Sequence, residues 1–130
     1  MPVSNKNAVG WLRGVIYDCR DHRAVCDFYR RLLGVEIQDE QEGWLELAPG
    51  SSSVIMGFCP VDPSRLERVG NQRVRIDIEV EDLDVAGAEA LALGATLVEV
   101  VHVRPDEEHR IYADPEGNEF NLVLPIPDNR

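Results

Sequence analysis

Apolar and polar positions along the chain predict short strands grouped around two helices. The clearest strand is RVRIDIEV at 73–80, where every second residue is apolar, as in a strand with one buried face. Shorter apolar or alternating runs have the composition of further strands. They are LRGVIYDC (12–19), VEIQ (35–38), WLELA (44–48), SVIMGF (53–58), TLVEVVHV (96–103), HRIYA (109–113) and EFNLVL (119–124).

Two other segments follow helical spacing. RDHRAVCDFYRRLLG has an N-cap residue in Asp21 and a stop signal in Gly34. EDLDVAGAEALALG begins at Asp82 or Asp84 and stops at Gly94. The residues expected to form the apolar surfaces of these helices are Val25, Phe28, Tyr29, Leu32 and Leu33 in the first, and Leu83, Ala90, Leu91 and Leu93 in the second.

The order of these elements repeats. Strand, helix and three strands occupy about 11–58, and the same series occupies about 73–124, with a Pro-containing linker at about 59–72. The matching helix ends and turns favour one supersecondary unit used twice. The sequence therefore predicts a single α+β domain, 1–130, built from two tandem βαβββ modules.

The segment IYADPEGNEFNLV combines a turn with the last predicted strand. Asp114, Pro115 and Gly117 occupy the first, second and fourth positions of a type I turn, so their role is structural. Glu119 and Asn121 follow at alternating positions among apolar residues. They are therefore the part of this segment that is available for chemistry.

Composition narrows the classes of partner. The formal net charge of -11 disfavours nucleic acid and anionic membranes, because both require a basic surface. The three cysteines have no CxxC spacing, which predicts neither a disulfide framework nor a zinc site. The sequence shows no signal peptide and no run of ~20 apolar residues that would span a membrane. A reducing cytoplasm is the expected location.

Three motifs in this order, DFYRRLLG, DIEVEDLD…ALALGA and YADPEGNEFNLV, resemble the vicinal oxygen chelate superfamily. This superfamily includes glyoxalase I, bleomycin-resistance proteins and extradiol dioxygenases. The resemblance extends from about Trp11 to Leu124 and is closest to the small single-domain glyoxalase-like proteins. It implies that the mixed sheet of the two βαβββ modules curls into a cup, with helices outside and a ligand inside.

The resemblance also assigns faces to the strands. In the strand at 73–80 the apolar positions, Val74, Ile76, Ile78 and Val80, are expected to pack on a helix, and the polar positions to face the cup. In the last strand the expected outward residues are Phe120, Leu122 and Leu124, and the expected inward residues are Glu119, Asn121 and Val123.

Metal-dependent relatives take His, Gln or Glu ligands from the first and last strand of each module. Counting along the motifs places these four positions at Gly14, Met56, Arg75 and Asn121. Glycine has no donor, a thioether is a poor ligand for a hard cation, and arginine has no lone pair to give. We therefore expect no metal and no other cofactor, and no glyoxalase I, dioxygenase or epimerase activity that depends on that metal.

One alternative retains a metal. A shifted register would bring Asp18, Asp77 or Glu119 toward an ion, which would make the chain a metalloenzyme of this superfamily with a relocated site.

Arg75 has two interpretations. Its guanidinium could replace the cation electrostatically and act as the electrophile of a metal-independent lyase or isomerase. It could instead pair with Asp18, Asp77 or Glu119 and have the purely structural role of balancing buried charges. His109 falls on an inward position and is a weaker catalytic candidate, a general base, without a carboxylate at motif spacing to support it.

The favoured function is the binding of a small molecule in the cup without a metal, and the sequence does not decide whether the protein is an enzyme. The expected ligand-binding residues are Arg75, Asp77, Asn121, Glu119, Met56 and Trp44. An alternative is sequestration of a cationic antibiotic, as in bleomycin-resistance proteins, with which the acidic charge is compatible. The resemblance further implies a homodimer.

Overall fold

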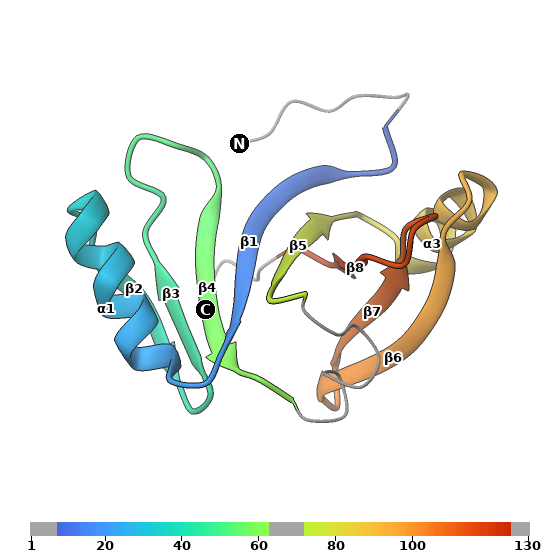
Figure 1. The fold of residues 1–130 in the computed structure, drawn as a ribbon. Coiled ribbons are helices and arrows are strands. Elements are labelled where there is room, and N and C mark those ends of the chain that lie inside the picture. The colour runs from blue at the N-terminus through green and yellow to red at the C-terminus, as the bar shows by residue number, and fades with distance from the viewer. Residues whose placement is uncertain (1–7, 63–71, 126–130) are drawn as a thin grey trace. The chain divides into compact units, whose positions relative to one another are not determined.

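The computed structural model describes residues 8–62 and 72–125, which form eight strands and two helices (Figure 1). In chain order these are β1 (Trp11–Cys19), α1 (His22–Leu33), β2 (Ile37–Gln41), β3 (Trp44–Leu47), β4 (Ile55–Pro60), β5 (Val74–Glu79), α3 (Leu83–Ala92), β6 (Thr96–Arg104), β7 (Glu107–Ala113) and β8 (Glu119–Val123). The predicted α+β class with two βαβββ series is confirmed. Residues 63–71, most of the predicted linker, lie outside the described residues.

Contacts divide the chain into two compact units. The N-terminal unit is Arg13–Ile76, and the C-terminal unit is Asp77–Arg130 together with Met1–Leu12. Strands lie in the order β2-β3-β4-β1 in the first, with the start of β5 beside β1, and in the order β5-β8-β7-β6 in the second. In both units the first and last strands of the module pair in parallel, β1 with β4 and β5 with β8. Each unit therefore has the same local topology.

In the N-terminal unit α1 packs on β3 and β4 (Figure 1). Asp21 caps the helix by accepting a hydrogen bond from the Ala24 backbone N–H, and Gly34 ends it in the left-handed conformation, as predicted. Beneath the helix lies the N-terminal cluster, which consists of Cys19, Cys26, Leu45, Leu47 and Phe58.

The apolar stripe of α1 is only partly buried. Val25 and Tyr29 pack against the N-terminal cluster, whereas Phe28, Leu32 and Leu33 are exposed. Helical spacing predicted this stripe, but it does not determine how much of the stripe the sheet covers.

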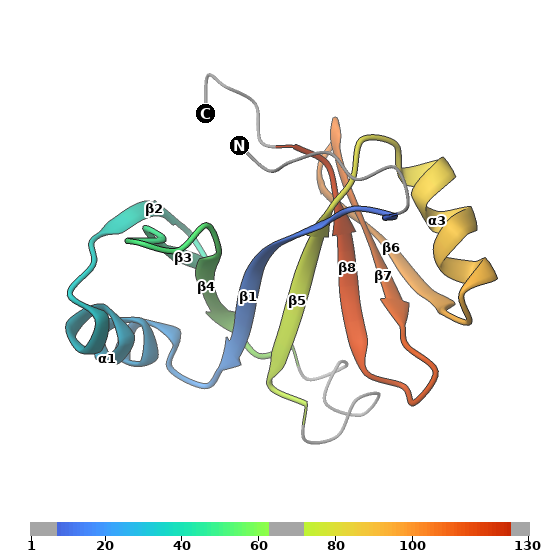
Figure 2. The ribbon, with the colours of Figure 1, turned by 90° about the horizontal axis from the view of Figure 1, so that it is seen from above.

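In the C-terminal unit α3 lies along one face of the strands (Figure 2). Asp82 is its N-cap and accepts from the backbone N–H groups of Asp84 and Val85. The C-terminal cluster beneath it consists of Val80, Leu83, Ala86, Tyr112 and Leu122. Gly87 has a packing role, since a Cβ there would lie 2.2 Å from the Tyr112 hydroxyl oxygen.

Part of the predicted apolar surface in this unit is exposed. Ile78 and Phe120 pack against the C-terminal cluster as predicted. The predicted packing of Leu124 is wrong, because this residue is exposed. Leu91 and Leu93, which were expected to supply apolar helix surface, are exposed as well. Val74 and Ile76, at the start of β5 in the N-terminal unit, were also predicted to pack on a helix. This prediction is wrong, because both residues are exposed. Alternation identifies the apolar side of a strand but not the length of helix available to cover it.

The turn between β7 and β8 has the predicted form. The Gly117 N–H donates to the Asp114 carbonyl at 2.9 Å, and the Asp114 carboxylate accepts from the backbone N–H groups of Glu116 and Asn118. Gly117 has a φ of 91°, a conformation that favours glycine. These bonds hold β8 in register with β7, where Ala113 is opposite Glu119 and Ile111 is opposite Asn121.

Candidate functional site

A buried polar row lies on the face of the C-terminal unit that points away from α3. Phe120 and Leu122 face the C-terminal cluster, so the alternate residues of β8, Glu119 and Asn121, face the other way. Asp77 lies opposite Asn121 on β5. Glu119, Asn121 and Asp77 are each more than nine-tenths buried. The sequence predicted these three residues as one side of a site, and the structure brings Asp77 and Asn121 into contact.

The Asn121 side chain makes one of its two expected kinds of bond. Its Nδ2 donates to the Asp77 Oδ1 atom at 2.8 Å. Its Oδ1 is buried and has no hydrogen-bond partner among the described residues. A buried carbonyl oxygen normally accepts a hydrogen bond, because leaving it without one costs about 1–3 kcal/mol.

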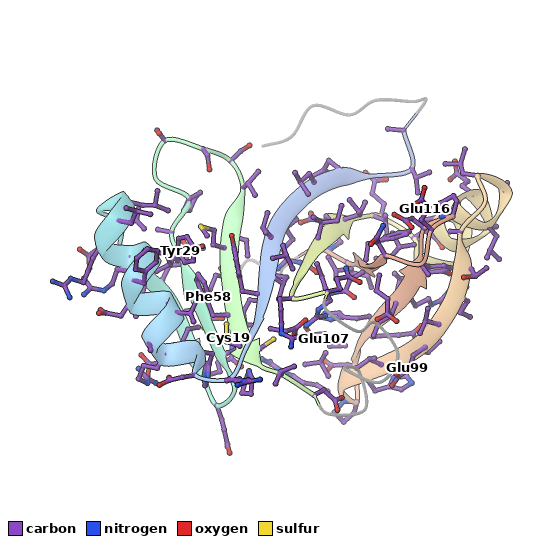
Figure 3. All side chains as sticks on the ribbon, in the orientation of Figure 1. Cys19, Tyr29, Phe58, Glu99, Glu107 and Glu116 are labelled. Carbon is purple, nitrogen blue, oxygen red and sulfur yellow. The ribbon has the colours of Figure 1, made fainter. Side chains whose placement is uncertain are left out.

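His109 lies on the same face of β7 as Ile111, which is opposite Asn121. Its Nε2 is 3.3 Å from an oxygen of Glu107 (Figure 3 labels this residue). The prediction that His109 has no supporting carboxylate is therefore wrong. The signal was in the sequence: residues two apart on a strand share a face, as Glu107 and His109 do. Glu107 also lies 3.5 Å from Arg104.

A second polar network lies in the N-terminal unit. Arg75 binds both carboxylate oxygens of Asp18, with Nε donating at 3.1 Å and Nη2 at 2.8 Å. The Asp18 side chain is 2% exposed and that of Arg75 15%. Asp18 was one of the partners considered for Arg75, and it binds the guanidinium in the bidentate geometry typical of a strong arginine–carboxylate pair.

Cys59 completes this network. Its thiol donates to the Asp18 Oδ1 at 3.3 Å, and Arg75 Nη2 lies 3.5 Å from its sulfur. Burial is the main reason that the pKa of the Cys59 thiol is raised to about 12. The Asp18 charge acts in the same direction, and Arg75 acts against it. Cys59 is therefore a protonated donor at neutral pH and not a nucleophile.

Met56 does not point where the sequence predicted. It packs against the N-terminal cluster on the side of Phe58, whose ring faces Tyr29 of α1 (Figure 3). The strand position that shares a face with Asp18 and Cys59 is its neighbour Gly57. The prediction is off by one because SVIMGF is almost continuously apolar and gives no alternation from which to read its faces.

Gly57 makes room for Trp44. A Cβ on Gly57 would lie 2.1 Å from the Trp44 ring, so the indole lies directly on the glycine backbone. Trp44 Nε1 donates to Glu46 at 3.2 Å, and Glu46, which is buried, also accepts from Gln38 at 2.6 Å. Trp44 was predicted as a ligand-binding residue; Glu46 and Gly57, which hold its ring, were missed.

The donor sets do not fit a divalent metal. Of the four positions that the sequence motifs assigned to metal ligands, Gly14 has no side-chain donor, Met56 packs against the N-terminal cluster, Arg75 is a cation, and Asn121 offers one amide oxygen. Asp18, one of the residues considered for a relocated site, is bound by Arg75. In the part of the chain that the structure describes, no three His, Cys, Asp or Glu side chains gather to hold an ion.

Comparison with known proteins identifies the family. The sequence matches the glyoxalase-like domain family over residues 14–123. The chain belongs to this family. No curated protein sequence matches the chain of this glyoxalase-like protein at a significant level. None of the helices that the structure describes is long and apolar enough to cross a membrane.

Many solved structures are similar to the glyoxalase-like protein, and three of them illustrate the range. Methylmalonyl-CoA epimerase from Mycobacterium tuberculosis is 20% identical, with a TM-score of 0.73 over 97% of this chain and 95% of that chain. The epimerase from Streptomyces coelicolor is 17% identical, with a TM-score of 0.61 over 92% and 100%. A glyoxalase/bleomycin resistance protein/dioxygenase superfamily member from Vibrio splendidus 12B01 is 19% identical, with a TM-score of 0.58 over 88% and 99%. These similarities confirm the fold, and at such identities they do not establish an activity.

Proposed function

We propose that this glyoxalase-like protein binds a small organic molecule on the C-terminal unit, without a divalent metal. The observation that carries this proposal is the buried Asn121 Oδ1, an acceptor with no partner among the described residues. A ligand that donates a hydrogen bond there would remove the cost of this unmet acceptor. Asp77 fixes the amide from the other side and so prepares it for binding.

Metal-free binding agrees better with the contacts than does catalysis by Arg75. The guanidinium is engaged by Asp18 through two of its nitrogens and also lies against the Cys59 sulfur. Moving Arg75 to a substrate would take two hydrogen bonds and an opposite charge from the buried Asp18, which is costly. Arg75 therefore supports the structure in this proposal, and Asn121 and Asp77 contact the ligand.

The test is a binding screen on chelator-treated protein. Neutral, cationic and anionic small organic molecules are ranked by their effect on the thermal unfolding temperature, and those that raise it are titrated calorimetrically. We expect binding to survive the chelator and to weaken at least ~10-fold in Asn121→Leu, since each factor of ten corresponds to about 1.4 kcal/mol.

A matched control is Gln41→Leu, which makes the same kind of change at an exposed amide of β2 and leaves binding unchanged. Affinity that disappears with the chelator and returns with a divalent ion would overturn the proposal. So would a screen in which no compound binds.

A further inference from the structure

The direction of the Asn121 amide determines what it can bind. Asparagine can be placed with its oxygen and nitrogen exchanged, but here Asp77 favours one placement. The Asp77 carboxylate accepts from Nδ2 at 2.8 Å, and the exchanged amide would put two oxygens against each other. The group that has no partner among the described residues is therefore the carbonyl oxygen, Oδ1. It calls for an N–H or O–H donor from a ligand.

His109 is a diagonal neighbour of Asn121 on the same face of the sheet. Ile111 lies opposite Asn121 on the adjacent antiparallel strand, and His109 lies two residues from Ile111 on β7. Residues two apart on a strand share a face, and the Cβ atoms of such diagonal pairs are about 7 Å apart. One small molecule can therefore contact both the amide and the imidazole.

The contact between His109 and Glu107 selects the tautomer of the imidazole. Its Nε2 atom lies 3.3 Å from the Oε2 atom of Glu107. A carboxylate only accepts hydrogen bonds, so it favours a proton on Nε2 and leaves the lone pair of the neutral imidazole on Nδ1. Glu107 is the one polar partner of His109 in the part of the chain that the structure describes. Nδ1 is therefore a second acceptor on this face.

Exposure to solvent rises from Asn121 toward His109. Asn121 and Ile111 are 6% and 7% exposed, whereas the side chains of His109 and Glu107 are 29% and 43% exposed. The face thus becomes more open along β7 toward the turn that joins it to β6. A ligand that lies along this gradient has one end at the buried amide and the other at the half-exposed imidazole.

We propose that the ligand of this site carries two hydrogen-bond donors, one for Asn121 Oδ1 and one for His109 Nδ1. This inference rests on the proposed function and names the class of ligand, of which an aromatic diol is a simple example. A ligand with one donor would leave one of the acceptors without a partner. Arg75 and Asp77 share a face of β5, so this side of the strand carries both signs of charge. Hydrogen bonding, rather than charge, therefore defines the class.

Three compounds of related shape test the number of donors. Resorcinol has two hydroxyl donors, 3-methoxyphenol has one and 1,3-dimethoxybenzene has none, and each is titrated calorimetrically into the full chain at pH 8.0. We expect resorcinol to bind at least ~5-fold more tightly than 3-methoxyphenol, the effect of about one hydrogen bond, and 1,3-dimethoxybenzene to bind most weakly. Equal affinities, or failure of resorcinol to bind, would overturn the inference. Comparison of resorcinol with 1,3-diaminobenzene then assigns O–H or N–H donors, whichever binds more tightly.

Histidine variants test whether the second donor is held by His109. His109→Phe keeps a planar ring and removes both nitrogens. It should weaken resorcinol binding ~5-fold and leave that of 3-methoxyphenol, whose single donor goes to the buried Asn121, nearly unchanged. The matched control is His102→Phe, since His102 lies opposite Glu108 and therefore on the other face of the sheet. Equal weakening by the two variants would contradict the inference.

NMR of the histidine rings measures the tautomer without a variant. The free protein should show His109 with its proton on Nε2, and resorcinol should shift the Nδ1 signal of His109 while those of His22 and His102 stay in place. A proton on Nδ1 in the free protein would overturn the inference. If a one-donor molecule binds as tightly as resorcinol and needs Asn121, the two-donor class is wrong and the proposed function stands. If no screened molecule binds, the proposed function is wrong as well.

Discussion

Each unit contains a buried polar network around an aspartate, and the two networks differ in which groups bind that aspartate. In the N-terminal unit Asp18 receives two bonds from Arg75 and one from Cys59. In the C-terminal unit Asp77 receives a bond from Asn121, whose own oxygen has no partner among the described residues. The first network balances a buried charge with a buried charge of opposite sign. The second leaves an acceptor available.

This difference separates a structural role from a functional one. Buried ion pairs are often architectural, and a fully bonded carboxylate has little capacity left for a ligand. An unmet buried acceptor lowers stability, so its presence calls for an explanation such as a bound molecule. In our proposal Arg75, which looked the most chemically active residue in the sequence, therefore has a structural role.

The largest expected effect on stability comes from breaking the network of Asp18, Arg75 and Cys59, called the closed network below. Arg75→Met leaves the buried charge of Asp18 without its bidentate partner and should lower the free energy of unfolding by about 3–5 kcal/mol. Adding Asp18→Asn removes that charge and should restore most of the loss. Urea denaturation of the single and the double variant measures these changes.

The control is Arg23→Met, which breaks the exposed pair with Glu40 and should lower the free energy of unfolding by about 1 kcal/mol or less. Equal losses for Arg75→Met and Arg23→Met would mean that burial of the first pair is unimportant.

A smaller effect on stability is expected from replacing the amide of the Asp77–Asn121 pair by a second carboxylate. Asn121→Asp places a second acid beside Asp77 and should destabilise the protein by about 2 kcal/mol at pH 7.5. Two adjacent carboxylates raise the pKa of one of them in the folded variant, because ionising both places like charges together. The folded variant therefore binds a proton more tightly than the unfolded chain. Stability relative to the wild type should therefore recover as the pH falls through that pKa.

The control for this variant is Asn118→Asp, which makes the same change beside Asp114 in the exposed turn. Because solvent screens charges in the exposed turn, Asn118→Asp should change the free energy of unfolding by only a few tenths of a kcal/mol relative to the wild type. Unfolding curves at pH 7.5 and pH 5 for the two variants decide the matter. A loss for Asn121→Asp that is independent of pH would show that shape, rather than charge, limits the site.

The smallest effect concerns Cys59 in the closed network. Because its folded-state pKa is raised from 9.0 to about 12, its contribution to stability is present below pH 9 and is lost as the pH rises toward 12. Alkylation of Cys59 by iodoacetamide, followed by mass spectrometry, should keep accelerating above pH 9 in the folded protein. A rate that levels off near pH 9, as in a urea-unfolded control, would indicate an ordinary thiol.

The sequence predicted the architecture well because the signals were redundant. Helix ends at Asp21, Gly34 and Asp82, alternation in β5, and the turn at Asp114 each pointed to the same repeated module, and the structure has it. Strand faces were predictable wherever polar and apolar residues alternate. In β4, where they do not, the prediction for Met56 failed.

The site was predicted less completely because its contacts join strands from different parts of the sequence. Alternation placed Asp77, Glu119 and Asn121 on one face, but the choice of Asp18 for Arg75 depends on β1 and β5 lying side by side. Trp44 was identified by residue type alone. The slot that holds its ring depends on Gly57, a residue whose importance lies in the side chain it lacks.

The turn at Asp114 has a consequence for how the protein could change over generations. Successive strand residues point to opposite faces, so one residue inserted between Ala113 and Glu119 would move β8 by one position relative to β7. Phe120 would then take the place of Asn121, and a position lined by an amide would become one lined by an aromatic ring. The length of this loop therefore selects the chemistry of the strand that follows, and one insertion could change ligand preference more than any single side-chain replacement on that strand.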